Sequence, residues 1–338
     1  MKKIAVIGSG GWGTAIAMLL ADNGHRVTLW SYLKEEAENL TRDRENKRFL
    51  PGVMLPESIY NTNSLEVAVR NAEVIFMVTP SQASAATAQK LCPYVRENTI
   101  VVNASKGLEQ TTQKRLSQVI GEAIPQAKIA VMSGPSHAEE VGRKLPTTNV
   151  IACSDSAVSQ SLQDILMCDT FRVYTSTDMV GVELGGALKN VIALCAGITD
   201  GLGQGDNAKA ALMTRGMAEI SRLGVAMGAD AATFSGLSGM GDLIVTCTSM
   251  HSRNRRAGML IGQGMTPEQA IEEVKMVVEG FYTTQAAWDL AKRMHVEMPI
   301  VEQAYRVLFE NMDPKEAVKN LMVRKKKHET EYEVINGR

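Results

Sequence analysis

A glycine-rich turn near the start of the chain restricts its fold more than any other feature. Gly8-Ser9-Gly10-Gly11-Trp12-Gly13 follows the apolar run 4–7, expected to be a buried strand, and precedes the helical run 14–22. Glycines spaced in this way let the backbone approach a pyrophosphate, and the helix N-terminus offers N–H groups and a positive dipole end. The turn therefore predicts a dinucleotide site, with a ligand-free glycine turn as the alternative.

Strand and helix signals alternate after this turn. Short, near-continuous apolar runs are typical of parallel strands covered on both faces, and they recur between helical stretches up to about residue 175. This alternation predicts an α/β fold with a doubly wound, Rossmann-type sheet. The strands are expected at 4–7, 26–30, 72–78, 99–103, 128–132, 148–153 and 171–174, and residues 46–56, which contain two prolines, are expected to form a loop.

Strand signals stop near residue 178, and the rest of the chain shows helical periodicity with many small residues. The sequence therefore predicts two domains, a dinucleotide-binding domain over 1–177 and an all-α substrate and catalytic domain over 178–338. A change from α/β to all-α leaves a cleft at the junction, where a small molecule can bind.

The first helix of the second domain, expected over 178–200, is apolar on both sides and is therefore expected to be buried. Between its flanking aspartates it carries only two charged residues, Glu183 and Lys189. Small residues one turn away on either side prevent the Lys189 ammonium from extending easily to water. Because burial lowers the pKa of an amine toward the range useful in proton transfer, Lys189 is a candidate catalytic residue, unless its head reaches the surface.

The residues after the second strand bear on the choice of nucleotide. An acidic residue there would hold the ribose hydroxyls of NAD, but the chain has Ser31, Tyr32 and, a little further on, Lys34. These side chains tolerate or bind a 2′-phosphate, so the sequence favours NADPH, with NADH possible. An ordinary solvated position for Lys34 stays open.

Two later strand ends place polar groups where ligands bind in this architecture. The strand 99–103 leads to Lys106, expected to meet cofactor or substrate if it is not a solvated loop residue. The strand 128–132 leads to a Gly134-Pro135-Ser136 turn that can offer N–H groups to an anion. For the adjacent His137, acidic neighbours and the lack of a nucleophile favour an orienting or capping role over a general base.

Two segments of the second half add candidate ligands. Asp242 ends a glycine-rich loop and either pairs with Lys189 or caps the next helix. Ser252-Arg253-Asn254 lies in a basic and hydroxyl-rich patch and suits a phosphate, with an exposed basic turn as the alternative. The charges of Arg215, Glu219 and Arg222 are expected on a solvated or interhelical ion-pair face of one helix, and those of Arg255 and Arg256 at the surface.

Composition excludes several classes. The net charge of −1 argues against nucleic-acid and membrane-surface binding. Five scattered cysteines without a CxxC pair fit a reducing cytoplasm rather than a disulfide framework or a zinc site. No apolar stretch is expected to reach the roughly 18 residues of a membrane span, and glycines interrupt the apolar N-terminal run. No ligand cluster for a metal is recognisable.

Seven stretches in a fixed order carry a resemblance that extends over essentially the whole chain. They are Gly8–Trp12–Gly13, Ser-Lys-Gly at 105–107, Ser-Gly-Pro-Ser-His-Ala-Glu-Glu at 133–140, Gly-Gly-Ala-Leu-Lys-Asn at 185–190, Gly-Met-Gly-Asp-Leu at 239–243, His-Ser-Arg-Asn at 251–254 and Val-Val-Glu-Gly at 277–280. Together they closely resemble the bacterial NAD(P)-dependent glycerol-3-phosphate dehydrogenases.

The resemblance implies reduction of dihydroxyacetone phosphate to sn-glycerol 3-phosphate for glycerophospholipid synthesis, by a homodimer with Lys189 as general acid/base. It implies substrate contacts from Lys106, Gly134, Ser136, Lys189, Asp242, Ser252, Arg253 and Asn254. It implies nucleotide contacts from Gly11, Trp12, Lys106, Ala138, Arg253, Val277 and Glu279.

The expected mechanism follows from these positions. The pyrophosphate lies at 8–13 and the substrate phosphate at 252–254, which holds the ketone near the nicotinamide. Lys189 and Lys106 stabilise the charge that develops on the carbonyl oxygen, and Lys189 supplies the proton. Two other functions stay open, a hydroxy-acid dehydrogenase of the same architecture and a non-catalytic redox sensor that binds the nucleotide.

Overall fold

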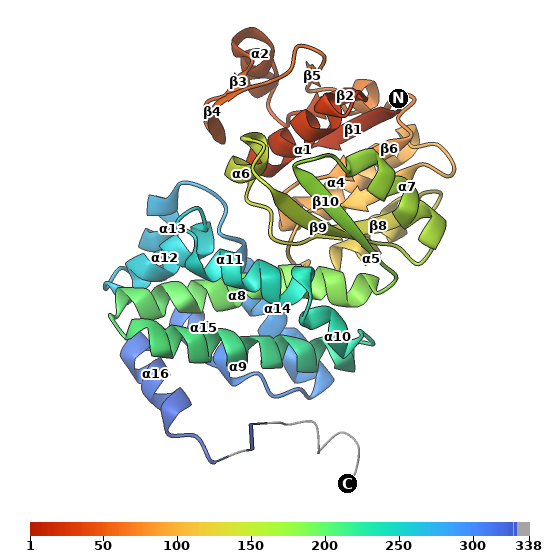
Figure 1. Ribbon diagram of the computed structural model, residues 1–338. Coiled ribbons are helices and arrows are strands. Elements are labelled where there is room, and N and C mark those ends of the chain that lie inside the picture. The colour runs from red at the N-terminus through yellow and green to blue at the C-terminus, as the bar shows by residue number, and fades with distance from the viewer. Residues whose placement is uncertain (327, 330–338) are drawn as a thin grey trace.

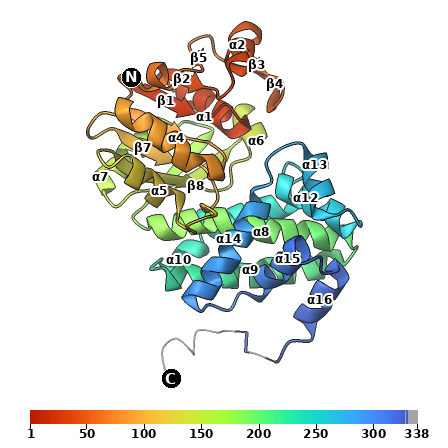
Figure 2. The same cartoon turned by 180° about the vertical axis from the view of Figure 1, so that it is seen from behind.

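The computed structural model describes residues 1–326, 328 and 329 and shows two halves, one above the other (Figure 1). The first half is a twisted sheet with helices on both faces, and the second, as far as it is described, is helical (Figure 2). This is the predicted fold class. The last strand, β10 (Phe171–Ser176), and the first helix of the second half, α8 (Met179–Gly201), flank residue 178. The domain limits themselves stay a prediction, and the final residues of the second domain lie outside the described part.

Seven strands join β10 in the main sheet. They are β1 (Lys3–Ile7), β2 (Arg26–Trp30), β5 (Tyr60–Thr62), β6 (Val74–Met77), β7 (Ile100–Asn103), β8 (Lys128–Ser133) and β9 (Thr147–Ala152). The order across the sheet is β10-β9-β8-β7-β6-β1-β2-β5. All neighbours pair in parallel except β8 and β9, so the last two strands run opposite to the others. A buried strand has the same apolar composition in either direction, so the sequence did not reveal this reversal.

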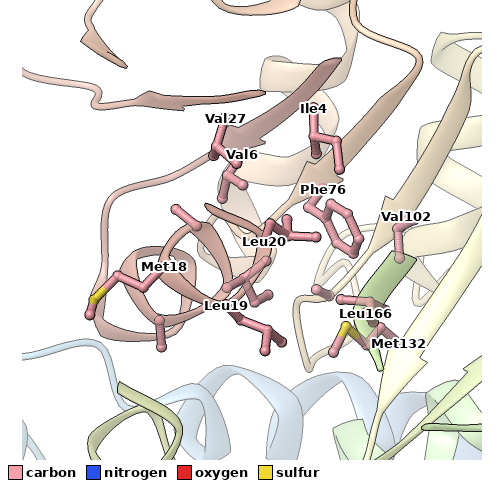
Figure 3. Packing of buried hydrophobic residues seen from close by; sticks show 14 of the residues in the cluster. Ile4, Val6, Met18, Leu19, Leu20, Val27, Phe76, Val102, Met132 and Leu166 are labelled. Carbon is pink, nitrogen blue, oxygen red and sulfur yellow. The ribbon is translucent and has the colours of Figure 1, made fainter. Parts of the chain in front are cut away.

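Apolar side chains bury both faces of this sheet. On one face lie α1 (Gly11–Asp22) and α7 (Ser156–Leu166), and Leu20 of α1 belongs to the same cluster as Phe76 and Met132 of the strands (Figure 3). On the other face lie α4 (Ser84–Leu91) and α5 (Leu116–Ala123). This arrangement places the carboxyl ends of β1, β6 and β7 at the edge that faces the second half.

The helix α8 is the central element of the second half and lies directly under the sheet, in contact with β8 (Figure 1). By length and mean hydropathy (1.5) it is long and apolar enough to cross a membrane, so the expectation that no apolar stretch reaches that size is wrong. However, 83% of its most apolar 18-residue stretch is buried inside the protein. Packing against neighbouring helices accounts for its composition. These neighbours include α9 (Gly205–Ala226), α11 (Asp242–Thr248), α12 (Arg253–Gly262), α14 (Glu279–Met294) and α15 (Pro299–Phe309).

Two segments differ from the sequence-based expectation. The expected loop 46–56 contains β4 (Leu50–Met54), which pairs antiparallel with β3 (Glu45–Asn46). Pro51 lies in this two-stranded ribbon, where a missing N–H is tolerated. The glycine-rich segment before Asp242 is one π-helical turn, Leu237–Gly241, that continues into α11 rather than an irregular loop.

Two charged side chains expected at the surface or in interhelical pairs have other surroundings. Glu219 on α9 is 2% exposed and accepts the N–H groups of Ile300 and Val301 at the start of α15. Arg255 is half-buried and donates to Asp200 at 2.8 Å. Helical periodicity did not show either contact, because the partners come from distant segments.

Candidate active site

The glycine-rich turn joins β1 to α1 and opens into a cavity between the two halves. Gly8 has a φ of 121°, and a Cβ atom at Gly13 would lie 1.8 Å from the Gly8 carbonyl oxygen, so neither position accepts another residue without strain. Helix α1 has Gly10 at its N-cap and no side-chain capping bond. Its first N–H groups and its positive dipole end can therefore serve an anionic ligand.

The cavity has a volume of about 750 Å³ and extends from this turn to α8 and α12. Ligand pockets typically measure about 300–1,000 Å³, so a dinucleotide end and a small substrate fit together. Most of the predicted site residues line it. They are Gly8, Gly10, Gly11, Trp12, Gly13, Tyr32, Lys106, Ser136, Ala138, Lys189, Ser252, Arg253, Asn254, Val277 and Glu279.

Three predicted site residues do not line the cavity. Ser31 is fully buried at the end of β2 and its hydroxyl has no partner, so the structure does not support it as a nucleotide contact. Gly134 and Asp242 lie behind the residues that line the cavity. There the Gly134 carbonyl oxygen and the Asp242 carboxylate accept hydrogen bonds from Lys106 Nζ, at 2.8 and 2.7 Å. Lys34 is largely exposed and pairs with Glu38 at 3.5 Å, the ordinary solvated position.

Two lysines share one buried carboxylate at the base of the cavity. Lys189, 5% exposed, donates from Nζ to Asp242 Oδ1 at 2.6 Å. Lys106 donates to the other oxygen, Oδ2. Of the two interpretations of Asp242, the pairing with Lys189 is therefore the one observed, whereas the N-cap of α11 is Gly241.

The surroundings of these groups shift their proton equilibria. Burial lowers the pKa of Lys189 to about 8, against the attraction of Asp242 and with the repulsion of Lys106. Burial opposes ionisation of Asp242, but the ammonium groups of Lys106 and Lys189 outweigh it and hold its pKa below the usual value. The site thus holds an amine that can exchange a proton near neutral pH.

Thr246 is a site residue that sequence reasoning missed. Its hydroxyl accepts from Lys189 Nζ at 2.5 Å and donates to the Asp242 carbonyl oxygen at 2.6 Å. The signal was its position four residues after Asp242, which places both side chains on the same face of α11. Thr246 fixes the direction of the ammonium group.

The segment 252–254 forms the far end of the cavity. Ser252 is the N-cap of α12 and accepts from the N–H of Arg255 at 3.2 Å. Asn254 donates to Asn190 at 2.9 Å and accepts from the N–H of Gly280 at 2.8 Å. A helix N-terminus with these side chains suits a phosphate.

Arg253 is the cationic group of this segment. Burial lowers its pKa, partly offset by Glu279 and Glu139. Its guanidinium has no hydrogen-bonded partner in the described part of the chain, and it lines the cavity. A half-buried guanidinium without such a partner favours an anionic ligand.

Glu279 connects the two halves above the cavity. Its carboxylate accepts from the N–H of Ser81 at 3.0 Å and from the Ser81 hydroxyl at 2.5 Å. Burial raises its pKa, which the Ser81 bonds oppose. Glu279 begins α14 (Glu279–Met294).

His137 lies at the N-cap of α6 (Ala138–Gly142) but makes no side-chain capping bond. Its ring lies 5.8 Å from that of His251, between centroids, and its Nε2 is buried without a partner. Burial lowers its pKa, reinforced by Lys189. The capping role is not observed, and the orienting role stays a prediction.

The donor set fits a dinucleotide. The indole Nε1 of Trp12 is buried without a hydrogen-bond partner, next to the uncapped start of α1. An anion or an amide carbonyl oxygen bound in the cavity would accept hydrogen bonds from the indole N–H and from the first N–H groups of α1. Among the residues described, no group of three or more His, Cys, Asp or Glu side chains is placed to hold a metal ion.

Known proteins resemble the chain over almost its full length. The model of the NAD-dependent glycerol-3-phosphate dehydrogenase N-terminus matches residues 3–159, and the model of the C-terminus matches 178–319. A glycerol-3-phosphate dehydrogenase (NAD(P)+) of Fusobacterium nucleatum is 55% identical over 97% of this chain and 99% of its own, and one of Desulfitobacterium hafniense is 54% identical over 98% and 94%. The crystal structure of glycerol-3-phosphate dehydrogenase from Coxiella burnetii matches with a TM-score of 0.93 and 38% identity, over 96% of this chain and 99% of that one.

Proposed function

Because this chain belongs to the NAD-dependent glycerol-3-phosphate dehydrogenase family, we propose that it reduces dihydroxyacetone phosphate to sn-glycerol 3-phosphate with NADPH. It is an oxidoreductase with a nicotinamide cofactor. The observation that carries the proposal is one cavity that joins the glycine-rich turn 8–13, two lysines bound to a buried carboxylate and the N-terminus of α12. The product would supply glycerophospholipid synthesis.

The nucleotide site consists of the turn 8–13 and the walls around it. The N–H groups at the start of α1 would hold the pyrophosphate, and Trp12, Ala138, Val277 and Glu279 would border the rest of the dinucleotide. When bound, the reduced nicotinamide supplies the hydride that the ketone carbon accepts.

The substrate phosphate would bind at the start of α12. Arg253 offers a charged fork, and Ser252 and Asn254 offer a hydroxyl and an amide within the same turn. Because this anchor is remote from the reacting carbon, its binding energy positions the ketone beside Lys189. Ser136 would close the opposite side, and Gly134 would support Lys106 through its carbonyl oxygen.

Lys189 would act as the general acid. Its ammonium stabilises the negative charge on the carbonyl oxygen and then transfers a proton to it. Lys106 contributes a second positive charge from across Asp242. Thr246 and Asp242 hold the Lys189 nitrogen in one direction, so that no reorganisation is needed during the reaction.

NADPH is the proposed nucleotide, with NADH accepted more weakly. Tyr32 and Lys90 line the cavity beyond β2, and the carboxylate there, Glu36, lies 3.5 Å from Arg48. No acidic residue follows β2 directly to bind the ribose hydroxyls. A Tyr32→Asp change is expected to raise the KM for NADPH and lower that for NADH, measured as two initial-rate series.

The deciding experiment is a spectrophotometric assay of NADPH and NADH oxidation with a panel of carbonyl compounds. Dihydroxyacetone phosphate is the expected substrate. Turnover of a 2-oxo acid instead would identify a hydroxy-acid dehydrogenase. Tight nucleotide binding without any turnover would identify a redox sensor.

Two further attributes belong to the proposal. A homodimer is expected from the family resemblance, and light scattering coupled to gel filtration measures the molar mass directly. A cytoplasmic location is expected from five cysteines that are all free in the structure. Fractionation of the source cells tests it.

A further inference from the structure

One carboxylate joins the lysine helix to the nucleotide-binding half. Glu183 on α8 is 3% exposed, two turns before Lys189. It accepts four hydrogen bonds from the first half: from Asn103 Nδ2 at 3.0 Å, Ser117 N at 2.7 Å, Ser117 Oγ at 2.5 Å and Arg115 Nη1 at 2.9 Å. These donors compensate the carboxylate for its removal from water.

The donors lie at both ends of one loop. Asn103 ends β7, and its side-chain amide also binds the N–H of Ser105 at 3.2 Å and the Ser105 carbonyl oxygen at 3.3 Å. Arg115 and Ser117 lie at the start of α5. The segment between them, 104–114, carries Lys106. Glu183 therefore binds the two ends of the Lys106 loop at once.

The same helix also contacts the middle of this loop. A Cβ atom at Gly186 would lie 2.2 Å from Ser133 Oγ and 3.6 Å from Lys106 Cγ, so α8 approaches β8 as closely as a glycine allows and lies next to the Lys106 stem. Asn190 donates to the Lys106 carbonyl oxygen at 3.4 Å. From Glu183 to Asn190, one face of α8 follows the loop.

We propose that Glu183 is a positioning residue that fixes the Lys106 loop on α8 and so holds the two lysine ammonium groups on opposite oxygens of Asp242. Glu183 is too far along the helix to touch the substrate and acts through Lys106. A displacement of about 1 Å in a catalytic group lowers turnover by about 100-fold, so the geometry set by Glu183 matters for rate. The inference rests on the proposed function only in its kinetic part.

The first test replaces Glu183 by glutamine. A glutamine side chain has one acceptor oxygen and an NH2 group, so it cannot accept all four donors. The Glu183→Gln enzyme is expected to lose about 10- to 100-fold in kcat with dihydroxyacetone phosphate. The dissociation constant of NADPH, measured by fluorescence, is expected to change less than about threefold, because the glycine-rich turn 8–13, where the pyrophosphate would bind, lies outside the Lys106 loop.

The pH profile separates positioning from loss of folded protein. The charged and titratable groups that face Lys189 are Asp242, Lys106, His137 and Cys247. If Lys106 leaves Asp242, the repulsion that lowers the pKa of Lys189 weakens, and the alkaline limb of ketone reduction moves to higher pH. A smaller folded fraction would lower the rate equally at every pH.

A readout without cofactor or substrate tests the loop directly. Hydrogen exchange of peptides that cover 104–117 is expected to accelerate in Glu183→Gln, because the Ser117 N–H loses a charged acceptor. If the wild-type enzyme ignored dihydroxyacetone phosphate but this acceleration were seen, the proposed function would fail while the anchoring role stood.

Glu219→Gln is the matched control. Glu219 is equally buried and also accepts N–H groups at a helix start, but it lies on α9, away from the Lys106 loop. It is expected to keep kcat within about twofold and to leave exchange at 104–117 unchanged. If Glu183→Gln does not fold, Arg115→Met removes only one donor and is expected to show the same pH shift on a smaller scale. The proposal is overturned if the alkaline limb of the pH–rate profile and the rate of hydrogen exchange at 104–117 are both unchanged.

Discussion

Lys189 and Asp242 meet inside the protein, with Nζ of the lysine 2.6 Å from Oδ1 of the aspartate, although they are 53 positions apart in the sequence. The lysine comes from the central helix α8 and the aspartate from the first turn of α11. Because both are buried, the pair is held in one geometry and its proton equilibria differ from those of exposed groups. The account of the reaction depends on this pair.

The direction of the reaction is expected to set opposite pH dependences. Burial lowers the pKa of Lys189 to about 8. Ketone reduction needs the ammonium form, so kcat/KM for dihydroxyacetone phosphate should fall as the pH rises through about 8. Oxidation of sn-glycerol 3-phosphate needs the free amine and should rise over the same interval. Rate profiles in both directions check this, and parallel profiles would count against Lys189 as the acid/base.

Asp242→Asn is expected to shift the fall in kcat/KM for ketone reduction to lower pH. The carboxylate raises the pKa of Lys189, and its loss leaves two facing ammonium groups without their shared anion. Removal of one partner of a buried ion pair costs about 3–5 kcal/mol, so a drop in the free energy of unfolding should accompany the shift. Denaturant unfolding and a pH–rate profile measure the two effects. If kcat/KM fell at the same pH as in the wild-type enzyme, Asp242 would not set the pKa of Lys189.

Arg253→Ala is expected to weaken substrate binding more than turnover. Hydrogen bonds to charged groups contribute about 1.5–3 kcal/mol, so the KM for dihydroxyacetone phosphate should rise about 10- to 100-fold. Dihydroxyacetone, which lacks the phosphate, is the control, and its slow reduction should be the same in both enzymes. If nucleotide affinity alone fell, Arg253 would belong to the cofactor site.

Glu219 is expected to make stability depend on pH. Burial raises its pKa from 4.5 to about 7, against the N–H bonds from Ile300 and Val301. The folded protein therefore binds the proton more tightly than the unfolded chain does. This contribution is full below pH 4.5 and is lost as the pH rises to about 7. Unfolding in urea at several pH values should show a decline in this interval that Glu219→Gln lacks; equal slopes would contradict the assignment.

The sequence was sufficient where the signal is local. Lys189 lies among small and apolar residues of its own helix, so its burial followed from its neighbours. The strand ends of the first half were readable because doubly covered strands are continuous apolar runs. The glycine turn and Lys106 consequently fell at the correct edge of the sheet.

The rest depended on contacts between distant segments. Thr246 and Glu183 bind partners that come from other elements, 57 and 66 or more residues away. For Asp242 the sequence left two interpretations open, because pairing and capping require the same residue type. Ser31 looked accessible at the end of β2, but the neighbouring strand β5 accepts its N–H and covers that end.

The most direct measurement is the single-turnover rate of NADPH oxidation by Lys189→Ala with saturating dihydroxyacetone phosphate. The account predicts a fall of about 10²- to 10⁴-fold, the usual size of a general acid–base contribution, with an unchanged dissociation constant for NADPH. A variant that reacts within a few fold of the wild-type rate would contradict the assignment of the proton to this lysine.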